Sequence, residues 1–209
     1  MRVLICGGGV IGASIAYFLS RRGARPIVIE RTGLACAASG KSGGFLALDW
    51  CDGTPLEALA RRSFALHAKL AEEIGGDWGY RRLATYAGFA GAQEAGRHSG
   101  SVYALDWLSD RVSLSQRLGS AETTAQVHPG RFTAAMMRAA QAGGAELRLG
   151  CVTGVLRGTS GASVQGVLVD GEIVVGDALV IAMGPWSILA ADWLPLPAVF
   201  GLKGHSLVF

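Results

Sequence analysis

The chain has 209 residues, of which 50% are hydrophobic and 17% are charged, and its net charge is +3 at pH 7. This hydrophobic content is enough for a large core and excludes a disordered chain. The charge is small and the Lys and Arg residues are scattered, so the composition predicts no nucleic-acid partner.

The first thirty residues have the pattern of a βαβ unit. An apolar run over residues 2–6 has the length of a buried parallel strand, and three glycines follow it directly. The amphipathic residues 13–22 predict a helix, which Gly23 can end in a left-handed conformation. Residues 26–29 predict a second buried strand that leads to Glu30.

The spacing Gly7-x-Gly9-x-x-Gly12 is typical of dinucleotide binding, with a separate task for each glycine. Gly7 permits a tight turn, Gly9 lets the backbone approach a pyrophosphate, and Gly12 lets the helix pack closely on the strand. Glu30 follows at the distance at which a carboxylate accepts hydrogen bonds from ribose hydroxyls, and its charge disfavours the 2′-phosphate of NADP. We therefore predict a dinucleotide site; a glycine turn in another kind of α/β protein is the alternative.

A second Gly-rich segment, SGKSGG at residues 39–44, follows soon after Glu30. By itself this composition is typical of a flexible loop. In this position, its backbone N–H groups, its Ser39 and Ser42 hydroxyls and the Lys41 ammonium are suited to bind the second phosphate of a dinucleotide. It is not a P-loop, because the GxxxxGK[ST] spacing is absent from it.

The remainder of the chain predicts a mixture of helices and strands. Helices are expected over 55–74 and 131–142. Strands are expected over 82–90, 146–149, 152–157 and 178–183, with a hairpin over 162–175 that turns at Asp170-Gly171 and a new strand from residue 199. We interpret the single histidines, His67 and His128, as structural.

The four cysteines have neither CxxC nor metal-ligand spacing, so we expect no metal site. They favour a reducing compartment, and the first strand begins too early for a signal peptide to precede it, so we expect a cytoplasmic protein. The apolar residues 173–202 are divided by Gly, Asp and Pro into pieces shorter than the ~20 residues of a membrane span. We therefore expect no transmembrane segment.

Three motifs occur together in the order found in a known family. They are GGGVIG followed by the Glu30-Arg31 pair, then SGKSGG, then VIAMGPWS at residues 180–187. As an ordered set they resemble the FAD-dependent D-amino-acid oxidase superfamily, which includes glycine oxidase and sarcosine oxidase. The segments VHPGRF, GGAEL, CVTGV and GLKGHSLVF extend this resemblance over the whole chain.

The resemblance implies an α/β fold: a Rossmann-like FAD-binding domain with a central parallel sheet of the glutathione-reductase type, plus part of an antiparallel α+β substrate domain. Residues 1–80 and 127–193 would form the FAD-binding domain, residues 81–126 a substrate-domain segment, and residues 194–209 the start of the substrate-domain sheet. Family members usually continue beyond this point, so we expect the chain to be a C-terminally truncated fragment or a degenerate relative.

The resemblance also implies a set of FAD contacts. The pyrophosphate would lie against Val10, Ile11 and the neighbouring glycines Gly7, Gly9 and Gly12, and the adenosine end against Glu30 and Arg31. The path toward the flavin would follow Ala38, Ser39, Gly43, Gly44 and Phe45. Backbone groups of Val152 would contact the adenine, and Gly184 and Trp186 would close over the cofactor, although a core aromatic at the end of a strand is an alternative reading of Trp186.

The activity that the resemblance implies is FAD-dependent oxidation of a C–N bond in a small-molecule amine or amino acid, with O₂ as the acceptor. No catalytic residue is predicted; Arg82, Tyr86, Lys203 and His205 are candidates only because their segments would face the substrate domain. One alternative is an NAD-dependent dehydrogenase, against which SGKSGG and GPWS argue. The other is an FAD-fold protein with an assembly or regulatory role and no turnover.

Overall fold

The computed structural model describes residues 1–90, 103, 105–109, 111–159, 161 and 163–205. The chain forms two compact units. The first unit consists of Met1–Gly43, Ile74–Trp78 and His128–Phe209, and the second unit of Gly44–Glu73 and Gly79–Val127. The domain boundaries given above remain a prediction.

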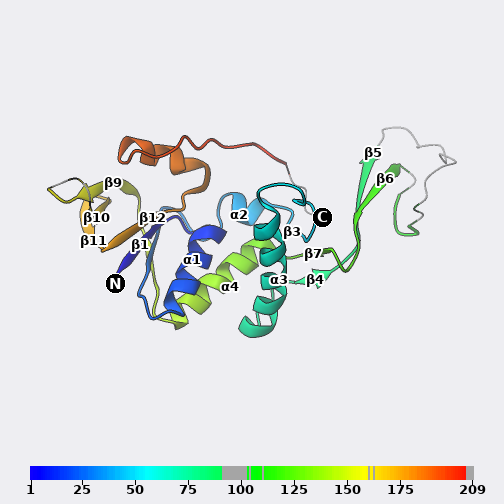
Figure 1. Ribbon diagram of the computed structural model, residues 1–209, viewed down its shortest axis with the longest axis horizontal. Coiled ribbons are helices and arrows are strands. Elements are labelled where there is room, and N and C mark those ends of the chain that lie inside the picture. The colour runs from blue at the N-terminus through cyan, green and yellow to red at the C-terminus, as the bar shows by residue number, and fades with distance from the viewer. Residues whose placement is uncertain (91–102, 104, 110, 160, 162, 206–209) are drawn as a thin grey trace. The chain divides into compact units, whose positions relative to one another are not determined.

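A four-stranded parallel sheet is the centre of the first unit (Figure 1). Its strands lie in the order β12 (Ala178–Ile181), β1 (Val3–Cys6), β2 (Ile27–Glu30) and β8 (Glu146–Leu149). Both central strands begin with three buried aliphatic residues, as expected for parallel strands that are covered on both faces. All four strands fall within or close to the segments that the sequence predicts.

Two helices cover one face of this sheet. The helices α1 (Val10–Ser20) and α4 (Pro129–Ala142) pack against each other and against β1, β2 and β8 (Figure 1). His128 caps α4, since its Nδ1 accepts a hydrogen bond from the Arg131 N–H at 3.3 Å, which supports a structural role for this histidine. The fully buried Trp78 packs edge-on against Phe132 of α4, with ring centroids 5.6 Å apart.

A three-stranded antiparallel sheet covers the other face. It consists of β9 (Val152–Arg157), β10 (Val164–Val169) and β11 (Glu172–Val175), paired in the order β11-β10-β9. Alternate residues of the parallel strands, such as Leu4 and Cys6, form a buried cluster with Val167 of β10. The hairpin turns at Asp170 and Gly171, whose φ angles of 48° and 89° are both positive, as the predicted type I′ turn requires.

The second unit contains one long helix and two small antiparallel sheets. The helix is α3 (Glu57–Ile74). One sheet has the order β3 (Phe45–Ala47), β7 (Thr124–Gln126), β4 (Arg81–Arg82), and the other pairs β5 (Thr85–Ala90) with β6 (Val112–Gly119). The α/β class with additional antiparallel sheets, expected from the sequence, is therefore confirmed.

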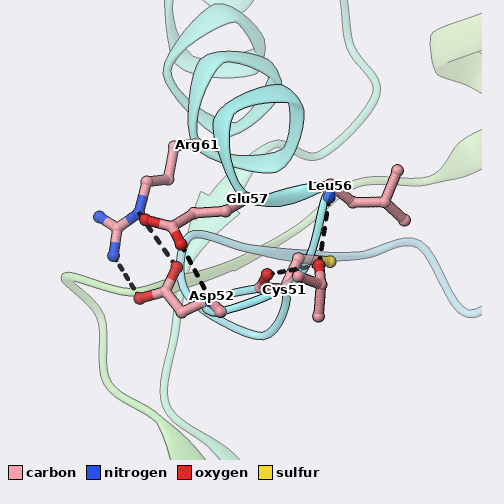
Figure 2. Close-up of polar contacts among 7 residues, drawn as sticks. Cys51, Asp52, Leu56, Glu57 and Arg61 are labelled. Atoms are coloured by element: carbon pink, nitrogen blue, oxygen red, sulfur yellow. Dashed lines mark hydrogen bonds and ion pairs between the residues drawn. The ribbon is translucent and has the colours of Figure 1, made fainter.

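Polar contacts fix the beginning of α3, as Figure 2 shows. The Glu57 carboxylate accepts a hydrogen bond from the Gly53 N–H at 2.9 Å, and Arg61 Nε donates to Asp52 Oδ1 at 3.0 Å. Arg61 also pairs with Glu57 one turn earlier, at 3.6 Å between Nε and Oε1. These groups are exposed, so they define where the helix starts more than they stabilise it.

A 3₁₀ helix forms over Gly184–Asp192, after β12, in agreement with the short helix expected within residues 173–202. The structure differs from the sequence predictions in two of the predicted segments. Part of the second Gly-rich segment forms a short helix, α2 (Ala38–Lys41), instead of a loop. Residues 199–205 form no strand, and residues 206–209 lie outside the described residues. Among the residues that the structure describes, no helix is both long and apolar enough to cross a membrane.

Candidate cofactor site

A cavity of about 310 Å³ lies at the carboxyl edge of the parallel sheet in the first unit. Residues directly after each of the four strands line it: Gly7 after β1, Arg31 after β2, Gly150 after β8 and Ala182 after β12. Ligands of open α/β sheets bind outside the carboxyl ends of the strands. The cavity therefore occupies the position that this topology provides for a cofactor.

Gly7 begins the tight turn that leaves β1. Its φ angle is +114°, and a Cβ atom here would lie 2.3 Å from the carbonyl oxygen of Ala182. The Gly7 N–H donates to the carbonyl oxygen of Ile29 at 2.8 Å, which ties the turn to β2. No residue with a side chain fits this turn without displacing the Gly7 turn itself or the backbone of Ala182 and Met183, which follow β12.

Gly12 brings the first turn of α1 against the same loop. A Cβ atom at Gly12 would lie 2.0 Å from the carbonyl oxygen of Gly7 and 3.3 Å from Cγ2 of Ile5. The first turn of α1, which the structure describes completely, carries no acidic residue, while Val10 and Ile11 line the cavity. The positive end of this helix dipole is therefore available to an anion in the cavity.

Ser39 joins the second Gly-rich segment to the first. Its Oγ accepts a hydrogen bond from the Val10 N–H at 2.9 Å, and a Cβ atom at Gly9 would lie 3.0 Å from the same oxygen. Gly9 is the N-cap of α1 and has no side chain, so Ser39 satisfies one of the free N–H groups of this helix end. Ala38 and Ser39 both line the cavity.

Glu30 is held by backbone amides on both carboxylate oxygens. Oε2 accepts from the Gly8 N–H at 2.7 Å, and Oε1 accepts from the Thr32 N–H at 3.0 Å. A carboxylate offers about four acceptor sites, so lone pairs remain for two hydroxyl donors. A Cβ atom at Gly8 would lie 3.0 Å from the Glu30 side chain, which accounts for the middle glycine of GGG, a position that the GxGxxG motif does not specify.

Arg31 and Trp186 meet at the cavity. The guanidinium carbon of Arg31 lies 4.5 Å from the centroid of the Trp186 ring, which is a cation–π distance. Both residues line the cavity, and Trp186 keeps 40% of its surface exposed. Trp186 is therefore not buried in the core, and its role in closing over the cofactor stays a prediction.

Three of the four cysteines also line the cavity, although no motif marks them. Burial raises the pKa of the Cys6 thiol to about 12, so Cys6 remains protonated at neutral pH. Cys36 and Cys151 are exposed free thiols. Within the described part of the chain, no group of three or more His, Cys, Asp or Glu side chains could hold a metal ion.

The structure brings most of the predicted site residues to one cavity and leaves the others outside it. The predicted residues that line it are Gly7, Gly9, Val10, Ile11, Glu30, Arg31, Ala38, Ser39, Val152, Gly184 and Trp186. Those that do not line it are Gly12, Lys41, Ser42, Gly43, Gly44 and Phe45, of which the last two belong to the second unit.

The four catalytic candidates have other surroundings. The Arg82 guanidinium stacks on Phe64 at 4.4 Å and donates to the Glu122 carbonyl oxygen at 3.0 Å. Tyr86 packs edge-on against Tyr103 at 5.3 Å. Lys203 and His205 are exposed. Since Arg82 is engaged with its own unit, its contacts indicate a structural role.

Comparison with known proteins identifies relatives over nearly the whole chain. The family model described as FAD dependent oxidoreductase (DAO) matches residues 2–209. The D-amino acid dehydrogenase of Xylella fastidiosa is 27% identical over 99% of this chain, and the 4-methylaminobutanoate oxidase (formaldehyde-forming) of Paenarthrobacter nicotinovorans is 30% identical over 90%. The crystal structure of glycine oxidase from Bacillus cereus superposes with a TM-score of 0.72 at 29% identity and covers 91% of this chain.

The chain spans less than two thirds of the length of each of these relatives: 64% of the dehydrogenase, 25% of the methylaminobutanoate oxidase and 58% of the glycine oxidase. The family match nevertheless covers both units. The chain therefore belongs to the DAO family of oxidoreductases, whose cofactor is FAD.

Proposed function

We propose that the first unit binds FAD along the carboxyl edge of its parallel sheet, with the pyrophosphate at the N-terminus of α1. The observation that carries this proposal is the meeting of the two Gly-rich segments at the Val10 N–H, inside a cavity that all four strand ends line. The Gly7 and Gly12 positions support it, because neither has space for a Cβ atom and both keep backbone close to the helix end.

The adenosine end of the cofactor would lie near Glu30 and Val152. The Glu30 carboxylate is already oriented by the Gly8 and Thr32 amides, and its free lone pairs suit ribose hydroxyls. Val152 begins β9 and lines the same cavity, so its backbone groups are available to an adenine. The family's dependence on FAD argues against an NAD-dependent reaction.

We further propose that the reaction oxidises a C–N bond of a small amine or amino acid, with O₂ as the acceptor. Bound FAD supplies the two-electron acceptor for the C–H bond beside nitrogen, which no amino-acid side chain supplies. The residues of the first unit bind and orient that cofactor. Two oxidases and a dehydrogenase of amines or amino acids among the relatives support this substrate class.

The test begins with the 209-residue chain purified without added cofactor. We expect visible flavin absorption close to one FAD per chain, or uptake of FAD but not NAD on titration. A folded, monodisperse protein that takes up no FAD would refute the cofactor assignment for this chain. Gly7→Ala serves as the matched variant, because the added Cβ would meet the Ala182 carbonyl oxygen at 2.3 Å and should abolish FAD uptake.

Turnover is measured separately with the FAD-loaded chain. Glycine, sarcosine, D-alanine, L-proline and 4-methylaminobutanoate are supplied in air, and peroxide release is followed. Peroxide from any member of this panel supports the oxidase proposal. Reduction of an artificial dye without peroxide would replace O₂ by another acceptor. Bound flavin that no substrate bleaches would favour the non-catalytic alternative.

A further inference from the structure

A second cavity, of about 460 Å³, lies at the opposite edge of the parallel sheet, where the strands begin. Three charged residues at the start of neighbouring strands line it: Arg2 before β1, Arg25 before β2, and Glu146 at the start of β8. Gly23 and Gly144, which come shortly after the helices α1 and α4, also line it. Among the described residues none lines both cavities, so this amino-edge cavity is separate from the cofactor cavity.

The strand register brings the three charged residues together. Strands β1 and β2 pair with Leu4 opposite Ile27, and strands β2 and β8 pair with Ile27 opposite Glu146. Continued outward by two residues, the same register places Arg2 beside Arg25. Neighbouring strands lie about 4.8 Å apart, and residues two apart along a strand share one face of the sheet. Arg2, Arg25 and Glu146 therefore belong to one face, within two residues of each other in register.

The three charged side chains are available to a ligand. Within the described part of the chain, the side chains of Arg2, Arg25 and Glu146 form no ion pair or hydrogen bond. The backbone N–H of Arg2 donates to Asp177 Oδ2 at 2.7 Å, but Asp177 does not line the cavity. All three charged residues are exposed, so a small molecule can reach them from solvent.

The ends of α1 and α4 add a second region of negative polarity. Gly23 and Gly144 come after the C-terminal ends of these helices, with φ angles of 79° and 93°, and a Cβ atom at either glycine would meet no atom within 4 Å. The C-terminal end of a helix carries a partial negative charge that attracts cations. The cavity thus offers two guanidinium groups to an anion, and a carboxylate beside two helix ends to a cation.

We propose that the amino-edge cavity binds a free α-amino acid as a zwitterion. The ligand carboxylate lies between Arg2 and Arg25, because a guanidinium presents a planar fork of N–H donors that fits a carboxylate. The ligand ammonium group donates to Glu146. A plain anion is less suited because Glu146 repels it, and a plain cation because the two arginines repel it. This inference goes beyond the proposed function and does not depend on FAD binding.

Three related compounds separate the parts of this recognition. L-Alanine carries both charges, propionate carries only the carboxylate, and ethylamine carries only the ammonium group. Each is titrated into the ¹⁵N-labelled, FAD-loaded chain, and the amide signals of Gly23 and Gly144 are followed. We expect saturable shifts with L-alanine and about tenfold weaker binding of propionate and ethylamine, because each of these lacks one set of charge-assisted hydrogen bonds.

Charge-neutral variants assign each half of the ligand to its residues. Arg25→Gln should weaken L-alanine and propionate alike by about tenfold, and Glu146→Gln should remove the preference for L-alanine over propionate. Arg138→Gln is the matched control, because Arg138 is an exposed arginine of α4 that does not line the cavity. We expect this control to bind L-alanine as the unmodified chain does. Unchanged amide signals outside the cavity show that each variant is folded.

The outcomes distinguish this site from the cofactor assignment. Propionate that binds as tightly as L-alanine would refute a zwitterion site. Shifts near the cofactor cavity without shifts at Gly23 and Gly144 would also refute it, as would unchanged L-alanine affinity in both Arg25→Gln and Glu146→Gln. The titration is repeated on the chain without FAD, where we expect the same affinity. If the chain takes up no FAD, the proposed function fails while this titration still tests the amino-edge cavity.

Discussion

Replacing Gly12 with alanine is expected to destabilise the first unit, although the position lies inside a helix. At an unobstructed helix position, this change stabilises by about 1 kcal/mol, because alanine has the higher helix propensity. At Gly12 the new Cβ would lie 2.0 Å from the Gly7 carbonyl oxygen and 3.3 Å from Ile5 Cγ2. A backbone oxygen cannot rotate away as a flexible side chain does, so the helix or the turn must move by about 1 Å.

Overpacking of this kind costs about 1–3 kcal/mol and occasionally more. We therefore expect Gly12→Ala to lose about 2 kcal/mol of stability, which corresponds to a melting temperature lower by roughly 4–8 °C for a chain of this size. FAD affinity should fall as well, because the displaced N-terminus of α1 no longer meets Ser39 and the cavity as before. Calorimetry of the apoprotein and a flavin fluorescence titration measure the two effects.

Gly130→Ala is the matched control, since Gly130 lies in the first turn of α4. The nearest atoms to its Cβ would be His128 Cε1 at 3.6 Å, Gly40 Cα at 3.7 Å and His128 Nδ1 at 3.8 Å, which are ordinary contacts. This change should be neutral or should stabilise by up to about 1 kcal/mol, with FAD affinity unchanged. If Gly12→Ala melts and binds FAD as Gly130→Ala does, the close approach of α1 to the glycine turn is not what holds the site together.

Three further predictions follow from single side chains. FAD should slow the alkylation of Cys36 and Cys151 by iodoacetamide, because both residues line the cavity, whereas the alkylation rate of Cys51 should not change. Equal rates for Cys36 and Cys151 with and without FAD would place the cofactor elsewhere. Burial lowers the pKa of His67, so the unfolded chain binds this proton first as the pH falls below about 6.5, and the free energy of unfolding decreases there. In His67→Gln, the free energy of unfolding measured in urea should therefore change less between about pH 7 and 5. The same pH dependence in the variant and the unmodified chain would contradict this prediction. Ser39→Ala should cost the apoprotein about 1 kcal/mol, the usual value of a helix cap, whereas Ser39→Thr should keep most of it, as urea midpoints would reveal.

Local sequence patterns predict the first unit well because its elements follow local rules. The strands β1 and β2 each form where the sequence has three consecutive aliphatic residues, and the Asp170-Gly171 pair forms the turn of a hairpin with two positive φ angles. The sequence does not predict the short helix α2, because its Ser and Gly residues favour a loop and the helix is only four residues long. The strand expected from residue 199 is an apolar run that forms none over its described residues.

Glycine spacing and motif order predict part of the candidate site. The spacing alone assigns a tight turn to Gly7 and close helix packing to Gly12, and the atoms that a Cβ would meet at each position support these two assignments. The spacing predicts no role for Gly8, because the side chain that leaves no space for a Cβ there belongs to Glu30, a residue of another strand. Cys36 and Cys151 lie in the cavity through their positions after β2 and β8, and cysteine spacing rules carry no signal for such a placement.

The contact between Ser39 and Val10 joins two Gly-rich motifs that lie far apart in the sequence. Helix capping is usually read from the residue before the helix, and at Gly9 that reading finds no side chain at all. A capping side chain at Gly9 would fill the space through which, in the proposed FAD complex, backbone amides approach the pyrophosphate. The cap is supplied instead by Ser39 of the second Gly-rich segment, 29 residues after Val10. The helix end is thus stabilised by a side chain from outside the helix, and its first two residues, Val10 and Ile11, line the cavity.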